Sequence, residues 1–451
     1  MTLNLPGPLR GFLLVPVIAV IIGSWFILHW YIGDTIAEYA PEFEESGSDM
    51  AQLAVKWAPN DPLAHFTLGN SMEKNFSMNQ IGDAVREYET AVSLAPNDYR
   101  YWMQLGRALE AAGRVDDSEK ALRHAVALAP AYSFPRWYFG NLLLREGKQD
   151  DAFRELVQAS QADPALLPQV FNLSWDLFGG DVDQIANATC PNIDTRAQLA
   201  VYLANRNEAD SAIRIWQNLN PKERREKHDA AEMLKKSFFE AGRFHYVLNL
   251  MADLEENASL LPRPETFSNA GFENDSSSRK AGKFGWLINT SPDAQIAVDH
   301  TLGHNGRASL EIVFKSPRSI DTIEVSQLVI VEPDTQYRFE CYARTLDLHT
   351  GSTPMILILD PADHSVLASS VPLPDGTNDW QAVTFDFKTR PRMEGVLIKL
   401  GRAPCGPDSV CPIFGTVWYD DFNLQRYSGA ASAVRSDAET RARSGTAGAL
   451  R

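Results

Sequence analysis

Three copies of one residue pattern, repeated about every 34 residues, occupy residues 60–164 and constrain the fold more than any other feature. Small residues recur where the two helices of a pair would approach each other closely. A proline recurs just past each second helix, where a missing backbone N–H costs little and further helix is blocked. The first copy carries three extra residues in its inner turn. The shared positions are Leu68, Gly69, Ala84, Tyr88, Ala91, Pro96, Trp102, Leu105, Gly106, Ala125, Pro130, Gly140, Ala152, Ala159 and Pro164.

This pattern resembles the tetratricopeptide repeat, a pair of amphipathic helices that stacks into a solenoid. Residues 33–261 are expected to form five or six such pairs after an introductory helix over 35–59, with a weaker pattern in the later pairs. The resemblance implies an extended concave face suited to peptides or partner helices, without a preformed chemical site. Aromatic residues of the array either form a recognition stripe or pack between helices: Trp57, Tyr101, Trp102, Trp137, Tyr138 and Phe139.

Residues 11–32 form an uninterrupted apolar stretch without a formally charged side chain. At about 1.5 Å per residue, a helix of this length matches the hydrocarbon thickness of a bilayer. Trp25, Trp30 and Tyr31 cluster at its far end, as interfacial aromatic side chains do. A cleaved signal peptide is the alternative, but its apolar region is usually shorter. We therefore expect a single-pass transmembrane helix.

The distribution of charge sets the expected orientation of this helix. Residues 1–10 carry Arg10 and the amino terminus, whereas acidic residues follow the span and the first lysine after it is Lys56. The positive-inside rule then keeps residues 1–10 in the cytoplasm and exports the remainder. The expected location is the inner (cytoplasmic) membrane, with the bulk of the chain on the periplasmic or extracytoplasmic side.

Composition narrows the classes of partner. The formal net charge is -16 and the isoelectric point is about 5.1, and no basic stripe interrupts this acidic balance. Phosphate backbones are repelled by such a chain, so nucleic-acid binding is disfavoured. The four cysteines form no CxxC motif and no cluster with zinc-site spacing.

Near residue 262 the periodicity changes from helical to alternating. Short runs of alternating or β-branched residues, separated by Gly, Pro, Asp and Asn clusters, predict an antiparallel β-sandwich over residues 262–427. Residues 428–451 lack periodicity and are expected to be disordered. The predicted fold class is therefore multidomain α + β: a transmembrane helix, a helical solenoid and a sandwich. The predicted strands are 294–299, 308–314, 322–331, 336–344, 355–360, 381–388, 395–401 and 415–424.

An ordered set of motifs runs through the sandwich region: Asn269–Glu273, Gly285–Trp286, Gly306–Leu310, Pro333–Tyr337, Trp380 and Trp418–Phe422. This set resembles jelly-roll carbohydrate-binding modules, which belong to the wider galactose-binding-like sandwiches. The resemblance implies a structural calcium ion held by Glu273 and Asp421, with Asp420 a less favoured ligand. Calcium takes about six to eight oxygen ligands, and only two are identifiable, so ordinary strand-end carboxylates are the alternative.

Glycan binding by this domain stays open, because fold transfers better than function. Sugar recognition needs exposed aromatic side chains beside polar groups. Tryptophans at positions where the family keeps packing residues are Trp286, Trp380 and Trp418, and the freer candidates are Phe284, Tyr342 and His349.

Two cysteines are predicted to pair. Cys405 and Cys411 flank a Gly/Pro-containing loop before the last strand, in a domain expected to be exported, so a disulfide is predicted between them. Cys341 lies within an apolar strand and is expected to be a buried thiol. The sequence makes no assignment for Cys190.

No nucleophile elbow, HExxH motif, phosphate loop or GxGxxG fingerprint is present. Asp420 and Asp421 are adjacent on a predicted strand and are expected to point to opposite faces, so they should not flank one glycosidic bond. We expect no enzyme and no required cofactor. The leading hypothesis is a membrane-anchored, exported scaffold for protein–protein interaction in cell-envelope or exopolysaccharide (surface-glycan) assembly. The alternatives are a glycan-binding protein whose helices form a stalk and, more weakly, a glycan-acting hydrolase.

Overall fold

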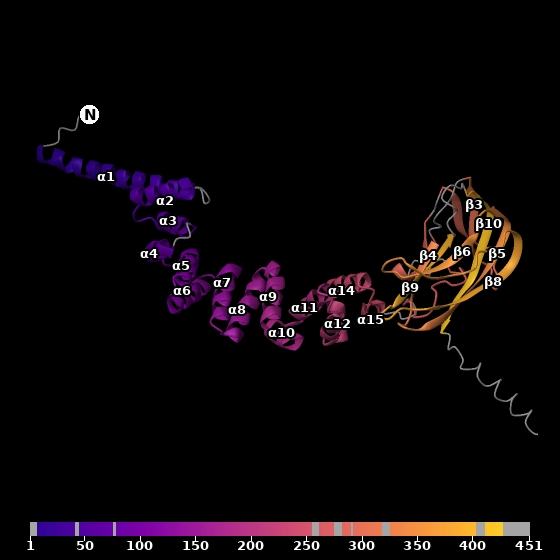
Figure 1. Ribbon diagram of the computed structural model, residues 1–451. Helices are drawn as coiled ribbons and strands as arrows, with labels where there is room; N and C mark the ends of the chain where they lie inside the picture. The colour runs from indigo at the N-terminus through magenta and orange to yellow at the C-terminus, as the bar shows by residue number, and fades with distance from the viewer. Residues whose placement is uncertain are drawn as a thin grey trace, which may run out of the picture. The chain divides into compact units, whose positions relative to one another are not determined.

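The computed structural model describes residues 7–40, 45–74, 78–254, 261–274, 282–289, 292–317, 325–402 and 411–426 (Figure 1). The chain divides into two compact units, Met1–Thr195 and Arg196–Arg451. The first unit is helical among its described residues. The second combines helices with two β-sheets. Residues 428–451, which were predicted to be disordered, lie outside the described residues.

The first helix, α1 (Gly7–Glu38), contains the apolar stretch and continues beyond it. Residues 15–38 are long and apolar enough to cross a membrane, by length and composition. A signal sequence near the N-terminus can meet the same test. The predicted limits of the introductory helix, residues 35–59, are wrong. That segment contains the end of α1 and a separate helix, α2 (Glu45–Trp57).

Antiparallel helix pairs follow α2 along the chain (Figure 1). The three pairs of the repeat pattern are confirmed, and each pair begins and ends close to its predicted turn. Beyond Pro164 the helices are shorter, and Gly179 and Gly180 adopt positive φ in the connection between α9 and α10. The helices of this region are α3 (Pro62–Lys74), α4 (Met78–Leu94), α5 (Tyr99–Ala111), α6 (Val115–Leu128), α7 (Ser133–Arg145), α8 (Gln149–Ala162), α9 (Leu167–Leu177) and α10 (Val182–Thr189).

The recurring glycines are required by close packing between paired helices. A Cβ atom at Gly106 would lie 2.5 Å from Leu122 Cγ. At Gly140 a Cβ atom would lie 2.7 Å from Leu156 Cγ. Gly69 has the same relation to the ring of Tyr88, at 2.8 Å. The predicted alanine positions of the second helices are fully buried: Ala84, Ala91, Ala125, Ala152 and Ala159.

Helices of the second unit lead into its sheets. The last two, α14 and α15, form an antiparallel pair, and Gly242 between them has a φ of +70°. The backbone N–H groups of Gly242 and Arg243 donate to carbonyl groups at the end of α14, which terminates that helix. The helices are α11 (Ile193–Asn205), whose first three residues belong to the first unit, α12 (Ala209–Gln217), α13 (Pro221–Glu226), α14 (His228–Glu240) and α15 (Phe244–Leu254).

Two antiparallel five-stranded sheets enclose one hydrophobic core, which confirms the predicted antiparallel β domain. The first sheet has the order β1-β4-β9-β6-β7, and the second sheet has the order β2-β3-β10-β5-β8. Strand side chains alternate between this core and the outer faces, as in β5, where Tyr337, Phe339, Cys341 and Ala343 are buried.

Most predicted strands are present within a few residues of their predicted limits. The two shortest strands were missed, β5 and β8 extend further than predicted, and part of the run 322–331 lies outside the described residues. The strands are β1 (Leu287–Ile288), β2 (Ala294–Asp299), β3 (Ser309–Ser316), β4 (Val325–Ile330), β5 (Gln336–Thr350), β6 (Pro354–Leu359), β7 (Val366–Ser369), β8 (Gly376–Lys388), β9 (Gly395–Arg402) and β10 (Ile413–Arg426).

Candidate functional site

One polar link recurs at the start of the first helix in each repeated pair. A side-chain nitrogen of that helix lies close to the carbonyl oxygen of the proline six residues earlier. The link therefore holds the turn between pairs against the helix that follows it. Three different side chains perform this role: His65 Nε2 at 2.9 Å from Pro59, Trp102 Nε1 at 2.8 Å from Pro96, and Arg136 Nε at 3.1 Å from Pro130.

The first helices of successive pairs share one polar face, which we call the first-helix face. Gln104 donates to the amide oxygen of Asn70 at 3.3 Å. Arg107 lies 3.8 Å from Glu73, and its guanidinium group lies 4.8 Å from the centre of the Tyr138 ring. These contacts join α3, α5 and α7. Because such partly exposed pairs contribute little to stability, their main effect is to give the face alternating charge and hydrogen-bonding groups.

Aromatic side chains lie at the starts of α5 and α7, two of the helices that carry the first-helix face. The rings of Tyr99 and Tyr132 are 5.0 Å apart, at the start of α5 and just before α7. Tyr132 is 57% exposed and Phe134 is 53% exposed. Large exposed aromatic side chains grouped in this way are typical anchors for a protein partner. We define Tyr99, Tyr132 and Phe134 as the aromatic patch.

The sequence prediction selected a different set of aromatic residues. Tyr101 and Phe139 are buried between helices, which favours packing over recognition for these two. Trp57 lies against His29 of α1 instead. The aromatic patch was missed because its members do not occupy signature positions. Their place two to four residues after the helix-ending proline was the available signal.

The paired helices and the polar face that their first helices share identify the first unit as a helical-repeat structure. Residues 99–132 match the family model of the tetratricopeptide repeat, so this region contains a repeat of that family. Superkiller protein 3 of Saccharomyces cerevisiae is 32% identical over 56 residues, which are 12% of this chain. The chain spans only about 4% of that curated relative.

Similar solved structures cover either the helices or the sandwich. MamA (residues 41 to the end) from Desulfovibrio magneticus RS-1 is 14% identical and covers 43% of this chain and 92% of its own, with a TM-score of 0.27. Pseudomonas aeruginosa PilF is 17% identical and covers 44% and 91%, with a TM-score of 0.30. A structure titled "CBM4 structure and function" is 18% identical and covers 36% and 100%, with a TM-score of 0.27. TM-scores this low define neither a shared fold nor a shared function.

The predicted calcium ligands lie close together in the sandwich. A Cβ atom at Gly271 would lie 3.4 Å from Asp420 Oδ1, 3.6 Å from Asp421 Oδ1 and 3.9 Å from Glu273 Cγ. Among the described residues, however, no three His, Cys, Asp or Glu side chains form a group that could hold a metal ion. The carboxylates would supply only some of the about six to eight oxygen ligands that calcium takes, and calcium binding stays a prediction.

These carboxylates hold the loop between β2 and β3. Glu273 Oε1 accepts the backbone N–H groups of Arg307 and Ala308, at 2.6 and 2.8 Å. Asp420 accepts the backbone N–H of His304 at 2.7 Å, and Asp421 lies 2.7 Å from the Nδ1 atom of the same histidine. Burial raises the pKa of Asp420, which is 1% exposed.

The expectation that Asp420 and Asp421 point to opposite faces is wrong. A β-bulge interrupts the pairing of β10 with β5 after Asp420, and Asp421 has a φ of +51°. This conformation turns Asp421 so that both carboxylates approach His304. Regular alternation along a strand therefore does not apply at this position.

The outer face of the second sheet carries aromatic and charged side chains together. The ring of His304 stacks on Tyr342 with a centroid distance of 3.7 Å, and Trp380 lies 5.7 Å from the same imidazole. Trp418 is paired in register with Arg344 of β5, and its indole N–H donates to Asp299 at 3.1 Å. We call this group the second-sheet face. Trp418 is only 7% exposed, so the accessible rings of this face are those of the half-buried His304, Tyr342 and Trp380. They lie beside hydrogen-bonding groups, a combination that sugar recognition uses.

The three aromatic residues that the sequence analysis named as candidates for sugar binding differ in exposure and surroundings. Tyr342 belongs to the second-sheet face, and His349 is exposed opposite Phe414. Phe284 was wrong as an exposed platform. It is 4% exposed and packs against Phe239 and Phe244 of the last helix pair. Trp286 packs against Phe272 and Phe422, as its predicted position implies.

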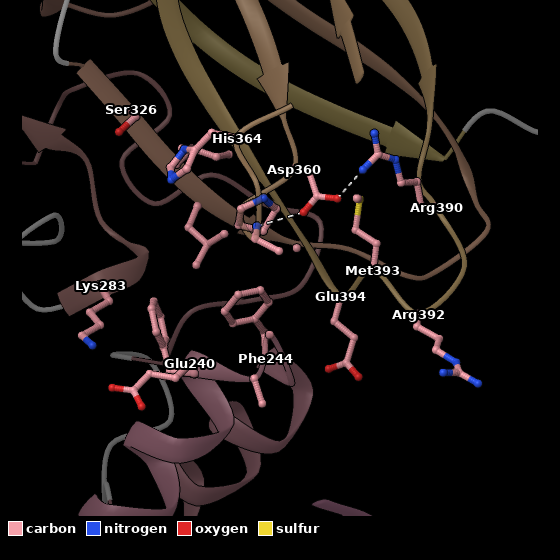
Figure 2. Close-up of a pocket in the computed structure, with 18 of the residues that line it drawn as sticks. Glu240, Phe244, Lys283, Ser326, Asp360, His364, Arg390, Arg392, Met393 and Glu394 are labelled. Atoms are coloured by element: carbon pink, nitrogen blue, oxygen red, sulfur yellow. Dashed lines mark hydrogen bonds and ion pairs between the residues drawn. The ribbon is translucent and has the colours of Figure 1, made fainter. Parts of the chain in front are cut away.

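A pocket of about 470 Å³ lies between the last helix pair and the first sheet (Figure 2). Its lining combines apolar side chains with charged groups. Asp360 accepts from Arg390 at 2.8 Å, and Glu394 accepts the backbone N–H of His245 at 3.0 Å. These contacts satisfy the two buried carboxylates of the lining, Asp360 and Glu394. The lining includes Phe239, Phe244, Leu287, Leu328, Met393, Leu397, Lys283, Asp360, Arg390, Arg392 and Glu394.

Three cysteines can be placed. Cys341 is fully buried, as expected, and burial raises the pKa of its thiol. Cys190 is buried at the end of α10. Cys411 is disulfide-bonded. Its predicted partner Cys405 lies outside the described residues, so that pairing stays a prediction.

Proposed function

We propose that this chain is a membrane-anchored, exported scaffold that binds a protein partner through its first-helix face and aromatic patch. Assembly of the cell envelope or of a surface glycan is the process in which such a scaffold would serve. The observation that carries the proposal is the exposed pair Tyr132 and Phe134, beside the polar face of helices whose repeat matches the tetratricopeptide family. The role is a non-catalytic one.

Partner binding should depend on the aromatic patch and not on the stability of the helices. Replacing Phe134 by alanine is expected to weaken partner binding about tenfold, the loss of about 1.4 kcal/mol that a modest interface anchor supplies. Phe134 is exposed, so the melting temperature should stay close to that of the original chain. Affinity would be measured with the full chain in membranes after cross-linking and co-purification have identified the partner.

A matched control is Val115→Ala, which removes an exposed apolar side chain from the start of the second helix α6. This variant should bind the partner normally. If Phe134→Ala and Tyr132→Ala bind the partner as tightly as the original chain does, the aromatic patch does not contribute to partner binding and that part of the proposal is wrong.

The second candidate function is glycan binding by the sandwich, favoured by the stacked rings of His304 and Tyr342 beside Trp380. Aromatic faces next to Arg344 and Asp299 suit a sugar ring and its hydroxyl groups. A glycan array probed with the full chain and with Tyr342→Ala separates the two functions. Glycan binding that needs Tyr342 would support this candidate, and a silent array would reject it.

A further inference from the structure

The end of α1 packs against the first helices of the solenoid. The His29 ring lies 4.7 Å from the Trp57 ring, between centroids, at the end of α2. A Cβ atom at Gly33 would lie 2.4 Å from the Cβ atom of Ala58, so only glycine permits this approach. The small buried side chains of Ala37, Ala54 and Ala64 continue the contact. The anchor helix and the solenoid therefore form one packed body within the first unit.

A hydrogen bond between side chains joins α1 to α3 in the same region. Trp30 bonds to the carboxylate of Asp61, which also accepts the backbone N–H of Ala64 at 3.0 Å and so caps α3. The hydroxyl group of Thr67 reaches the carbonyl oxygen of Ala37 at 3.5 Å. Contacts with both α2 and α3 fix the rotation of α1 as well as its position.

These contacts set the depth of α2 relative to the expected span. His29 lies within residues 11–32, and Ile32 follows it three positions further along the helix. At the helical rise of about 1.5 Å per residue, Trp57 lies beside a point about 4.5 Å inside the end of the span. The last turn of α2 therefore reaches the boundary between hydrocarbon and headgroups.

The side chains of this turn suit that boundary. Leu53 is 42% exposed and lies one helical turn before Trp57. Lys56 adjoins them and can extend its ammonium group toward lipid phosphates. Trp25, which is 60% exposed on α1, also contacts His29, with the two ring centroids 4.4 Å apart. We call Leu53, Lys56 and Trp57 the α2 patch.

We propose that the α2 patch lies in the membrane–water interface, next to the aromatic end of α1, and attaches the solenoid directly to the bilayer. The inference rests on the proposed function, because it needs residues 11–32 to span a membrane. Apolar side chains of interfacial helices enter the boundary by about 5–10 Å. The consequence is that the first-helix face has a fixed orientation relative to the membrane.

Depth measurements on the full chain in phosphatidylcholine vesicles test the proposal. A fluorescent label is attached to Leu53→Cys, to Asp49→Cys one helical turn (about 6 Å) further from Trp57 on the same face of α2, and to Val20→Cys in the span. The unsubstituted chain gives the background from native thiols. Label at position 53 should emit at shorter wavelength than label at position 49. It should also be quenched by lipids that carry a spin label near the headgroup.

The outcomes separate this inference from the anchor itself. Immersed label at position 20 with water-exposed label at position 53 would overturn the inference and leave the anchor standing. Water-exposed label at both positions would reject the anchor. Shielding at position 53 without lipid quenching would indicate contact with a second protein copy and would also overturn the inference. Adding Gly33→Val, which separates α1 from α2, should return label 53 to water while label 20 stays immersed.

Discussion

Replacing Phe244 by alanine is expected to lower the free energy of unfolding of the second unit by about 3–5 kcal/mol, the usual cost of removing a buried phenylalanine ring. Phe244 is 3% exposed at the start of α15. Its ring fills the space left by the missing side chain of Gly395 on β9, where a Cβ atom would lie 2.7 Å from the ring. It also contacts Phe239 and Phe284 edge-on.

Chemical denaturation of the full chain in detergent, with hydrogen exchange to locate the change, would measure this effect. Backbone amides of α15 and β9 should exchange faster in Phe244→Ala, because the ring of Phe244 packs against Gly395 of β9. Leu287→Ala is the matched control, since Leu287 lines the same pocket but is 56% exposed. The control should change stability by less than about 1 kcal/mol. Similar losses in both variants would show that Phe244 does not join the helices to the sheet.

Local repetition explains which parts of this fold could be predicted. A helix pair needs a small residue wherever its two backbones approach each other. Gly106 and the Leu122 side chain that packs over it therefore lie within one short segment of sequence, where the pattern can be recognised. The same holds for the end of each pair, where proline stops the second helix. Alternation along strands identified the core of the second unit for the same reason, because strand neighbours alternate between faces.

Contacts between distant segments explain most of what was missed. Nothing near Phe244 indicates that Gly395 will receive its ring, and the pocket between the last helix pair and the first sheet depends on that contact. Phe284 was expected to be exposed, and the same helix pair covers it. At Asp421 the cause is local, since a single positive φ changes the direction of one carboxylate and alternation cannot reveal it.

The two candidate functions use different surfaces of the molecule. Partner binding is assigned to the first-helix face and aromatic patch of the first unit. In the second unit, the last helix pair packs on the first sheet, whereas Tyr342 and Arg344 lie on the second sheet. Loss of one binding activity need not disturb the other, so variants at Phe134 and Tyr342 can be interpreted independently.

Two glycines in neighbouring repeats should respond to alanine in opposite directions. At Gly106, a Cβ atom would lie 2.5 and 2.8 Å from two side-chain atoms of Leu122, and Leu122 is fully buried and cannot move aside. Gly106→Ala is therefore expected to destabilise the helical unit by about 1–3 kcal/mol, the cost of overpacking a closed interface. At Gly82 in α4, by contrast, no atom lies within 4 Å of a Cβ position.

Gly82→Ala should stabilise the unit by about 0.5–1 kcal/mol, because alanine favours the helix where no neighbour opposes it. Thermal and urea unfolding of both variants, followed by far-ultraviolet circular dichroism, would give the sign and size of each change. The pair separates helix propensity from packing, since both substitutions are the same and both sites are helical. Stabilisation by Gly106→Ala would show that α5 and α6 can move apart at little cost. The recurring glycine would then not be explained by close approach of the paired helices.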